Sequence, residues 1–173
     1  MTGSRRTEKE WKWCVKGLRA AAARAQKRSV CLCLEPLNRF ETYFLNTLAD
    51  AARLLRDVGA PNVRIHFDTF HSNIEEQHPA EALRAVAEDL GHVHLSENDR
   101  GIPGTGHVDW KGILKVLKAT VYDGWLTIES FAQPEPALAA AAAIWRDLAP
   151  SGDDLARQGL RFTKSLARKL GIC

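Results

Sequence analysis

Apolar residues alternate along the chain between short continuous runs and longer stretches with helical spacing. The short runs predict four buried strands, at 30–35, 63–68, 92–96 and 125–129. Periodicity close to 3.6 predicts a helix after each strand, at 46–58, 79–90, 109–120 and 135–148. Two further helices are predicted outside these units, at 8–27 and 153–170.

Strands that alternate with helices indicate a parallel sheet joined by right-handed crossovers. The 173 residues suit a single domain, and the spacing of the units fits a (β/α) barrel or a doubly wound sheet. A complete (β/α)₈ barrel takes roughly 250 residues. The four units, with one extra helix before them and one after them, leave both folds open at this point. Glycine-rich nucleotide-binding motifs follow none of the strands.

Composition places the chain among globular proteins, with 45% apolar and 26% charged residues. Its longest weakly polar run, 137–145, is far shorter than the roughly 20 residues of a membrane helix. The polar first ten residues lack the apolar core of a secretion signal. Cysteines 14, 31, 33 and 173 have no metal-site spacing. We therefore expect a cytoplasmic protein with reduced thiols and no membrane partner.

Positive charge is concentrated at the N-terminus. Residues 1–28 hold nine Lys and Arg against two Glu, a net charge of +7, and the remainder sums to −4. A nucleic-acid patch would carry this charge together with the aromatic or glycine pattern of a nucleic-acid module, which the segment lacks. We interpret it as the solvated face of a helix and expect no nucleic-acid partner.

Each predicted strand carries, at its end or close to it, a side chain that can bind a metal ion. These residues are Glu35, Asp68, His94 and Glu129. Because the carboxyl ends of parallel strands meet at one face of the sheet, four distant positions are expected to converge there. An oxygen-rich set with one imidazole suits Mn²⁺, Co²⁺ or Mg²⁺. Strand alternation places His66 and His92 on the same side, where we interpret them as interior histidines supporting the ligands.

Polar groups just beyond the strand ends are candidates for substrate contacts. Glu41, His71 and Arg100 occupy such loop positions. Their side chains can hydrogen-bond to hydroxyl or phosphate oxygens. Arg100 could instead form a structural salt bridge with Asp99 or Glu97, and these two acids could instead order their own loop.

Five motifs with specific joint spacing resemble one known superfamily. They are LEPLNRFE at 34–41, FDTFH at 67–71, HVHLSENDR at 92–100, GTGHVDW at 104–110 and IESF at 128–131. Together they resemble the sugar phosphate isomerase/epimerase superfamily, with its xylose isomerase-like TIM barrel. Within it they are most similar to the D-tagatose and D-psicose (allulose) 3-epimerases.

The resemblance implies a set of site roles. Metal ligands for Mn²⁺ or Co²⁺ would be Glu35, Asp68, His94 and Glu129. Two of these, Glu35 and Glu129, would also be the catalytic carboxylates. Substrate contacts or carboxylate-orienting contacts would come from Glu41, His71 and Arg100.

The chemistry implied is proton transfer next to a ketose carbonyl. One carboxylate would remove a proton from one face and the other would return a proton to the opposite face, through an enediolate stabilised by the cation. A single base would instead favour aldose–ketose isomerisation, and the sequence leaves both open. Arg100 is the one obvious cation near the loops, which favours unphosphorylated sugars.

The four units match the second half of the family's barrel. The resemblance therefore implies a parallel (βα)₄ half-barrel with an extra N-terminal and C-terminal helix. Either a second copy of the chain or a complementary half-barrel could complete it, or the chain could be a truncated, non-catalytic metal-binding half-barrel or interaction protein. A barrel nuclease of the endonuclease IV kind is disfavoured by the −4 charge outside residues 1–28, since such an enzyme needs a basic groove.

Overall fold

The computed structural model describes residues 3–133 and 135–172. The strands are β1 Leu32–Leu34, β2 Val63–Asp68, β3 Leu90–Leu95 and β4 Leu126–Ile128. The α-helices are α1 Glu8–Gln26, α2 Leu48–Val58, α3 Thr69–Glu75, α4 Pro79–Ala85, α5 Trp110–Ala119, α6 Pro136–Ala142 and α7 Gly152–Lys169. A 3₁₀ turn, η1, covers Ala87–Asp89 between α4 and β3.

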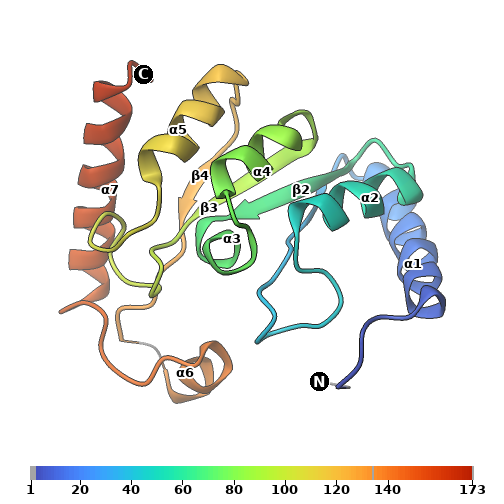
Figure 1. Cartoon of the computed structure of the whole chain (residues 1–173), viewed down its shortest axis with the longest axis horizontal. Helices are drawn as coiled ribbons and strands as arrows, with labels where there is room; N and C mark the ends of the chain where they lie inside the picture. Colours follow the sequence, from blue (N-terminus) through green and yellow to red (C-terminus); the bar gives the residue numbers. More distant parts are fainter. Residues whose placement is uncertain (1–2, 134, 173) are drawn as a thin grey trace.

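The four strands form one parallel sheet in the order of the sequence, β1-β2-β3-β4. Figure 1 shows the connecting helices beside this sheet, with α1 and α7 at its two ends. The predicted fold class, a parallel (βα)₄ half-barrel with an additional helix at each end, is confirmed. The strand tips therefore lie along one edge, where side chains from distant parts of the sequence can meet.

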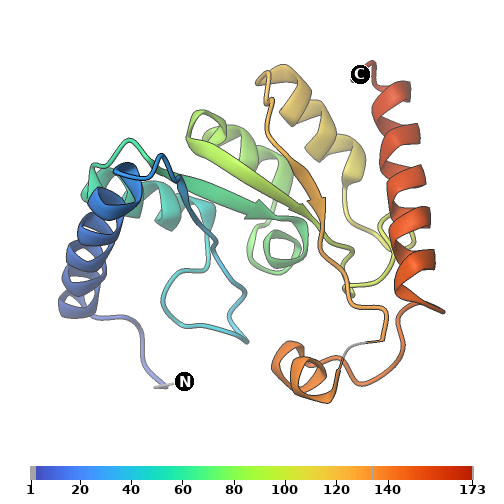
Figure 2. The same ribbon diagram turned by 180° about the vertical axis from the view of Figure 1, so that it is seen from behind.

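Alternate residues of the central strands form the core. Ile65, Phe67, Val93 and Leu95 are almost fully buried beneath α2, α4 and α5. Removing each side chain from water contributes about 1.5–3 kcal/mol, so this outer face holds the helices on the sheet. Residues of opposite parity form the inner face, and several, such as His92, are half-buried. Figure 2 views the strands from that side.

Helix starts and ends follow local chemistry. The Thr7 side chain accepts a hydrogen bond from the Glu10 amide, and the Glu10 carboxylate accepts one from the Thr7 amide, which completes a capping box. The predicted cap Asp109 accepts from the Gly112 amide at the start of α5. Helix α2 ends at Gly59, whose φ of 64° is the left-handed conformation that glycine adopts without strain.

Two of the predicted helices are too long, and one helix was not predicted. The helix predicted at 79–90 ends at Ala85, because Leu90 pairs with Ile65 and begins β3. The helix predicted at 135–148 ends at Ala142, since Ala143 adopts a left-handed conformation. Helix α3 follows β2 directly, because the Asp68 side chain caps it.

No helix within the described ranges combines the length and the apolar character that crossing a bilayer requires.

Candidate functional site

The four side chains predicted as metal ligands lie together at the strand tips. The Nδ1 atom of His94 is 3.6 Å from Asp68 Oδ2 and 3.5 Å from Glu129 Oε1. It is 3.9 Å from Glu35 Oε1. Register explains part of this geometry, since Asp68 and His94 are paired positions on β2 and β3. Three carboxylates from three elements therefore surround one imidazole nitrogen.

Several of these atoms are buried and lack a hydrogen-bond partner. They are Glu35 Oε1, Asp68 Oδ2 and His94 Nδ1. Buried polar atoms are almost always hydrogen-bonded, so three unpartnered atoms in one cluster require an explanation. One atom from each of these three residues lies within 4.8 Å of the others, a spacing at which a single cation can be held. The donor set fits a hard divalent ion bound mainly through oxygen.

Asp68 uses its two oxygens for different purposes. Its Oδ1 atom accepts hydrogen bonds from the amides of Phe70 at 2.6 Å and His71 at 3.1 Å, which caps α3. Its Oδ2 atom points to His94. The cap fixes the carboxylate rotamer, so that the second oxygen is aimed at the site before any ion binds.

The carboxylates of this cluster repel one another, and their charges shift the pKa values of the groups around them. Burial raises the pKa of Glu35 to about 7, and the charges of Asp68 and Glu129 add to that shift. Burial lowers the pKa of His94, but the neighbouring carboxylates of Asp68 and Glu129 raise it to about 9 overall. Contact with His94 lowers the pKa of Glu129 to about 2, against burial and with help from Arg100. A divalent cation would replace the protons that this cluster retains.

Arg100 lies at the centre of the loop contacts. Its guanidinium forms an ion pair with Glu129 and lies 3.5 Å from Glu41 Oε1. The same group stacks over the rings of Phe70, at 4.1 Å, and Phe131, at 5.3 Å. The sequence offered two interpretations of Arg100, contact with the site or a structural salt bridge to Asp99 or Glu97. The geometry supports the first, because the guanidinium pairs with Glu129 and Glu41.

His71 is held in a defined orientation. The backbone N–H of Asn38 donates to His71 Nδ1 at 3.1 Å, so the proton of the neutral ring lies on Nε2. Burial lowers the pKa of His71 and keeps the ring neutral. His71 Nε2 is 3.1 Å from Arg100 Nη2. Two donors therefore face each other, and a single oxygen atom of a ligand could accept from both.

A pocket of about 480 Å³ opens beside these groups. Its polar wall includes Asn38, Glu41 and Arg100, and its apolar wall includes Phe40 and Phe70. Helix α6 and the residues that follow it close the far side. The volume suits a small molecule. Arg100 lines the pocket and pairs with Glu129, so the pocket adjoins the acid cluster through this ion pair.

Comparison with known proteins identifies the family. A model of the xylose isomerase-like TIM barrel matches residues 1–166. The chain belongs to this family. A probable ketose 3-epimerase from Synechocystis sp. is 40% identical over 138 residues, which are 80% of this chain and 48% of that protein. A D-psicose 3-epimerase from Agrobacterium fabrum is 36% identical over 155 residues, covering 87% of this chain and 54% of that protein.

Solved structures agree with this assignment. The D-allulose 3-epimerase from Methylomonas sp. superposes with a TM-score of 0.90 at 34% identity. The superposition covers 95% of this chain and 58% of that chain. This chain of the xylose isomerase-like family thus spans about half the length of the curated relatives that it matches.

Sequence reasoning assigned no role to Asn38, which holds two of the loop groups together. Besides orienting His71, Asn38 donates from Nδ2 to Glu41 Oε1 at 2.8 Å and is only 2% exposed. It lies within the LEPLNRFE motif, between Leu37 and Arg39, and its place in that motif was the available signal.

Glu97 orders the loop before α5, as one of the alternatives predicted. Its fully buried carboxylate accepts hydrogen bonds from the amides of Gly104 and Val108 and from Trp110 Nε1. These bonds outweigh burial and lower the pKa of Glu97. The loop that presents Arg100 is therefore tied to the start of α5.

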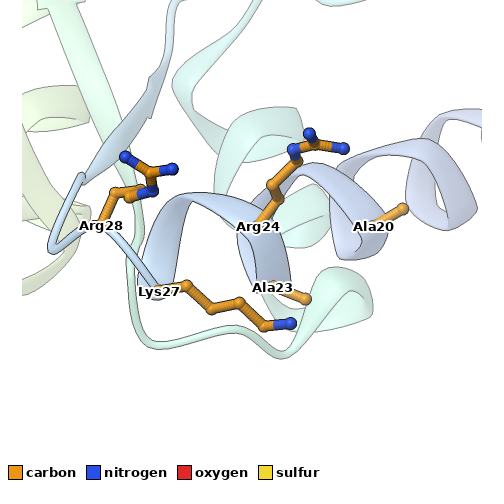
Figure 3. Close-up of a pocket in the computed structure, with 5 residues that line it drawn as sticks. All are labelled: Ala20, Ala23, Arg24, Lys27 and Arg28. Atoms are coloured by element: carbon orange, nitrogen blue, oxygen red, sulfur yellow. The ribbon is translucent and has the colours of Figure 1, made fainter.

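The basic N-terminal segment forms α1 and the residues flanking it. A pocket of about 470 Å³ lies at the C-terminal end of α1. Figure 3 shows the residues that line it, among them Arg24, Lys27 and Arg28. The three charged groups point in different directions and do not converge on one point. Other basic residues hold the helix in place, since Arg6 pairs with Asp50 of α2 at 2.7 Å.

Proposed function

We propose that this chain carries the metal-binding and proton-transfer half of a divalent-metal-dependent sugar epimerase acting on ketoses. The observation that carries the proposal is the cluster of unpartnered ligand atoms from Glu35, Asp68 and His94, with Glu129 beside it. Mn²⁺ or Co²⁺ is the expected ion, with Mg²⁺ as the harder alternative. When bound, the cation would act as a Lewis acid toward the carbonyl oxygen of the substrate.

Glu35 and Glu129 are the proposed proton-transfer groups. They extend from the first and last strands of the sheet, on either side of His94. One removes the proton from the carbon next to the ketose carbonyl, and the other delivers a proton to the opposite face, which inverts that carbon. Contact with His94, together with the Arg100 ion pair, lowers the pKa of Glu129 and favours its ionised form.

The loop groups would orient the sugar. His71 and Arg100 present two facing donors, which suits a hydroxyl or carbonyl oxygen of the substrate. Glu41 offers a carboxylate that can accept from a hydroxyl, and Asn38 fixes its position. The family's 3-epimerases, including those named for D-psicose, make a ketose the first substrate class to test.

The pocket favours an unphosphorylated sugar. Of the described residues that line it, Arg100 and Arg146 carry positive charge. Arg100 is paired with Glu129 and Glu41, and Arg146 is paired with Asp99 at 3.2 Å. A phosphate group would have to break one of these pairs before it gained a cation, whereas hydroxyl groups need no such charge.

The test is exchange of the C3 hydrogen of a ketose with solvent deuterium, followed by NMR. The chain is incubated with D-psicose or L-ribulose in D₂O, with Mn²⁺ or with a chelator. We expect exchange with Mn²⁺ only, and its loss in Glu35→Gln or Glu129→Gln. Exchange reports proton removal even where the full epimerisation is slow. Mn²⁺ binding without exchange would instead favour the alternative, a non-catalytic metal-binding half-barrel.

The same proposal includes a partner for the inner face of the sheet. A second copy of the chain or a complementary half-barrel would cover that face and pair with the edges of β1 and β4. The mass of the chain in solution, measured with and without Mn²⁺ and ketose, distinguishes the two. A dimer of the isolated chain favours the second copy, and a monomer without exchange favours a separate complementary half.

A further inference from the structure

We propose that His66, His92 and His94 form a second, imidazole-rich metal site that takes a late transition ion such as Zn²⁺. One nitrogen from each of the three rings lies within 4.8 Å of the other two. The site is distinct from the acid cluster of the proposed function, but it shares His94 with that cluster.

Strand register produces this arrangement. His66 and His92 are paired positions on the adjacent parallel strands β2 and β3, and His94 lies two residues further along β3 on the same face. The ring centroids are 5.0 Å apart for His66 and His92, 4.0 Å for His66 and His94, and 5.2 Å for His92 and His94. The three rings meet edge to face.

The spacing needs little adjustment to hold an ion. Zn²⁺ binds imidazole nitrogen at about 2.0–2.1 Å, which separates tetrahedral ligands by roughly 3.4 Å. Small side-chain rotations close a triangle with edges of at most 4.8 Å to that size. His92 is half-buried on the inner face, where water can supply a fourth ligand.

Burial also indicates a ligand at His66. The side chain is only 8% exposed, and its Nε2 atom has no hydrogen-bond partner. An interior histidine that merely supports the acid cluster would have both nitrogens paired. His66 Nδ1 lies 3.6 Å from Glu35 Oε2, which leaves Nε2 as the atom without a role until an ion binds.

Because His94 belongs to both sites, binding of an ion at one site affects binding at the other. Three imidazoles favour ions late in the divalent series, whereas the carboxylates of Glu35 and Asp68 favour Mn²⁺. Because the two sites share the His94 ring, two divalent cations bound there would lie close together and repel each other. Zn²⁺ bound to the three histidines would therefore weaken Mn²⁺ binding at the acid cluster, which makes the second site inhibitory.

The test compares His92→Gln with His107→Gln. His92 makes no ion pair with the acid cluster among the described contacts, and His107 is an exposed loop histidine that serves as the matched control. Zn²⁺ affinity is measured by competition with a chromophoric chelator, and Mn²⁺ affinity by electron paramagnetic resonance. We expect His92→Gln to weaken Zn²⁺ binding at least ~10-fold and to change Mn²⁺ binding less than ~2-fold. His107→Gln should change neither.

Equal Zn²⁺ affinity in the two variants would overturn the proposal. A parallel loss of Zn²⁺ and Mn²⁺ binding in His92→Gln would also overturn it, since it would indicate a structural effect. His92→Asn provides a second variant if the first does not fold. Failure of the proposed function has a different signature. In that case the unmodified chain would not bind Mn²⁺, while Zn²⁺ binding would still depend on His92.

Discussion

The divided role of Asp68 allows metal binding and helix capping to be separated by two substitutions. Asp68→Asn keeps an oxygen that can accept from the amides of Phe70 and His71, but it removes the negative charge directed at His94. Asp68→Ala removes both the capping oxygen and the negative charge. A lost N-cap costs ~1 kcal/mol, which lowers Tm by about 2–4 °C in a chain of this size.

The magnitudes follow from linkage. Mn²⁺ at 100 times its Kd stabilises the unmodified chain by about 2.7 kcal/mol, a rise in Tm of roughly 5–10 °C. Loss of a charged ligand should weaken Mn²⁺ binding more than ~100-fold, beyond the range for groups outside the coordination shell. Asp68→Asn should therefore lose almost all of the Mn²⁺-induced rise. In chelator, its Tm should lie close to that of the unmodified chain, because the lost repulsion between Asp68 and Glu35 is offset by the lost attraction between Asp68 and His94.

The assay is thermal unfolding by circular dichroism in EDTA and in excess Mn²⁺, with affinities from calorimetry. Asp68→Ala should fall below Asp68→Asn in EDTA by the cap contribution alone. A Mn²⁺-induced rise in Asp68→Asn equal to that of the unmodified chain would refute a ligand role for Asp68. Equal stability of the two variants in EDTA would refute the capping argument.

Three other predictions concern the surroundings of the site. Mn²⁺ affinity should increase from pH 6 to pH 8, because Glu35 with a pKa of about 7 and His94 with a pKa of about 9 must release protons; calorimetry in two buffers would count those protons, and a flat profile would contradict the electrostatics. Arg100→Lys should slow C3 exchange ~10–100-fold, because an ammonium group cannot stack on two rings while contacting two carboxylates; unchanged exchange would remove Arg100 from the site. Glu97→Gln should destabilise the chain by ~1–3 kcal/mol in urea, since an amide NH₂ would face a buried N–H donor; unaltered stability would show that the loop does not depend on this carboxylate.

Hydrophobic spacing was sufficient to predict the fold class. The four apolar runs became strands because each places aliphatic side chains such as Ile65 and Val93 beneath the helices, and that burial requires the period of two that the sequence displays. Boundaries were harder to predict. Leu90 fits the helical stripe of the preceding segment, and only pairing with Ile65 on the neighbouring strand assigns it to β3.

Side chains with two roles account for what was missed at the site. Asp68 was predicted as a ligand at a strand tip, but its second function as the cap of α3 leaves no separate mark in the sequence. Asn38 acts through the backbone N–H that it donates to His71, a contact that depends on the path of the loop rather than on residue type. His66 and His92 were expected as supporting residues, and only the register of β2 and β3 brings their rings together with His94.

The central claim is that the strand tips hold one divalent cation, and anomalous diffraction from crystals grown with Mn²⁺ tests it most directly. The predicted result is a single strong manganese peak within ~2.5 Å of His94 Nδ1 and of carboxylate oxygens from Glu35, Asp68 and Glu129. Manganese found elsewhere, or no peak at these four side chains in a folded chain saturated with Mn²⁺, would contradict the account.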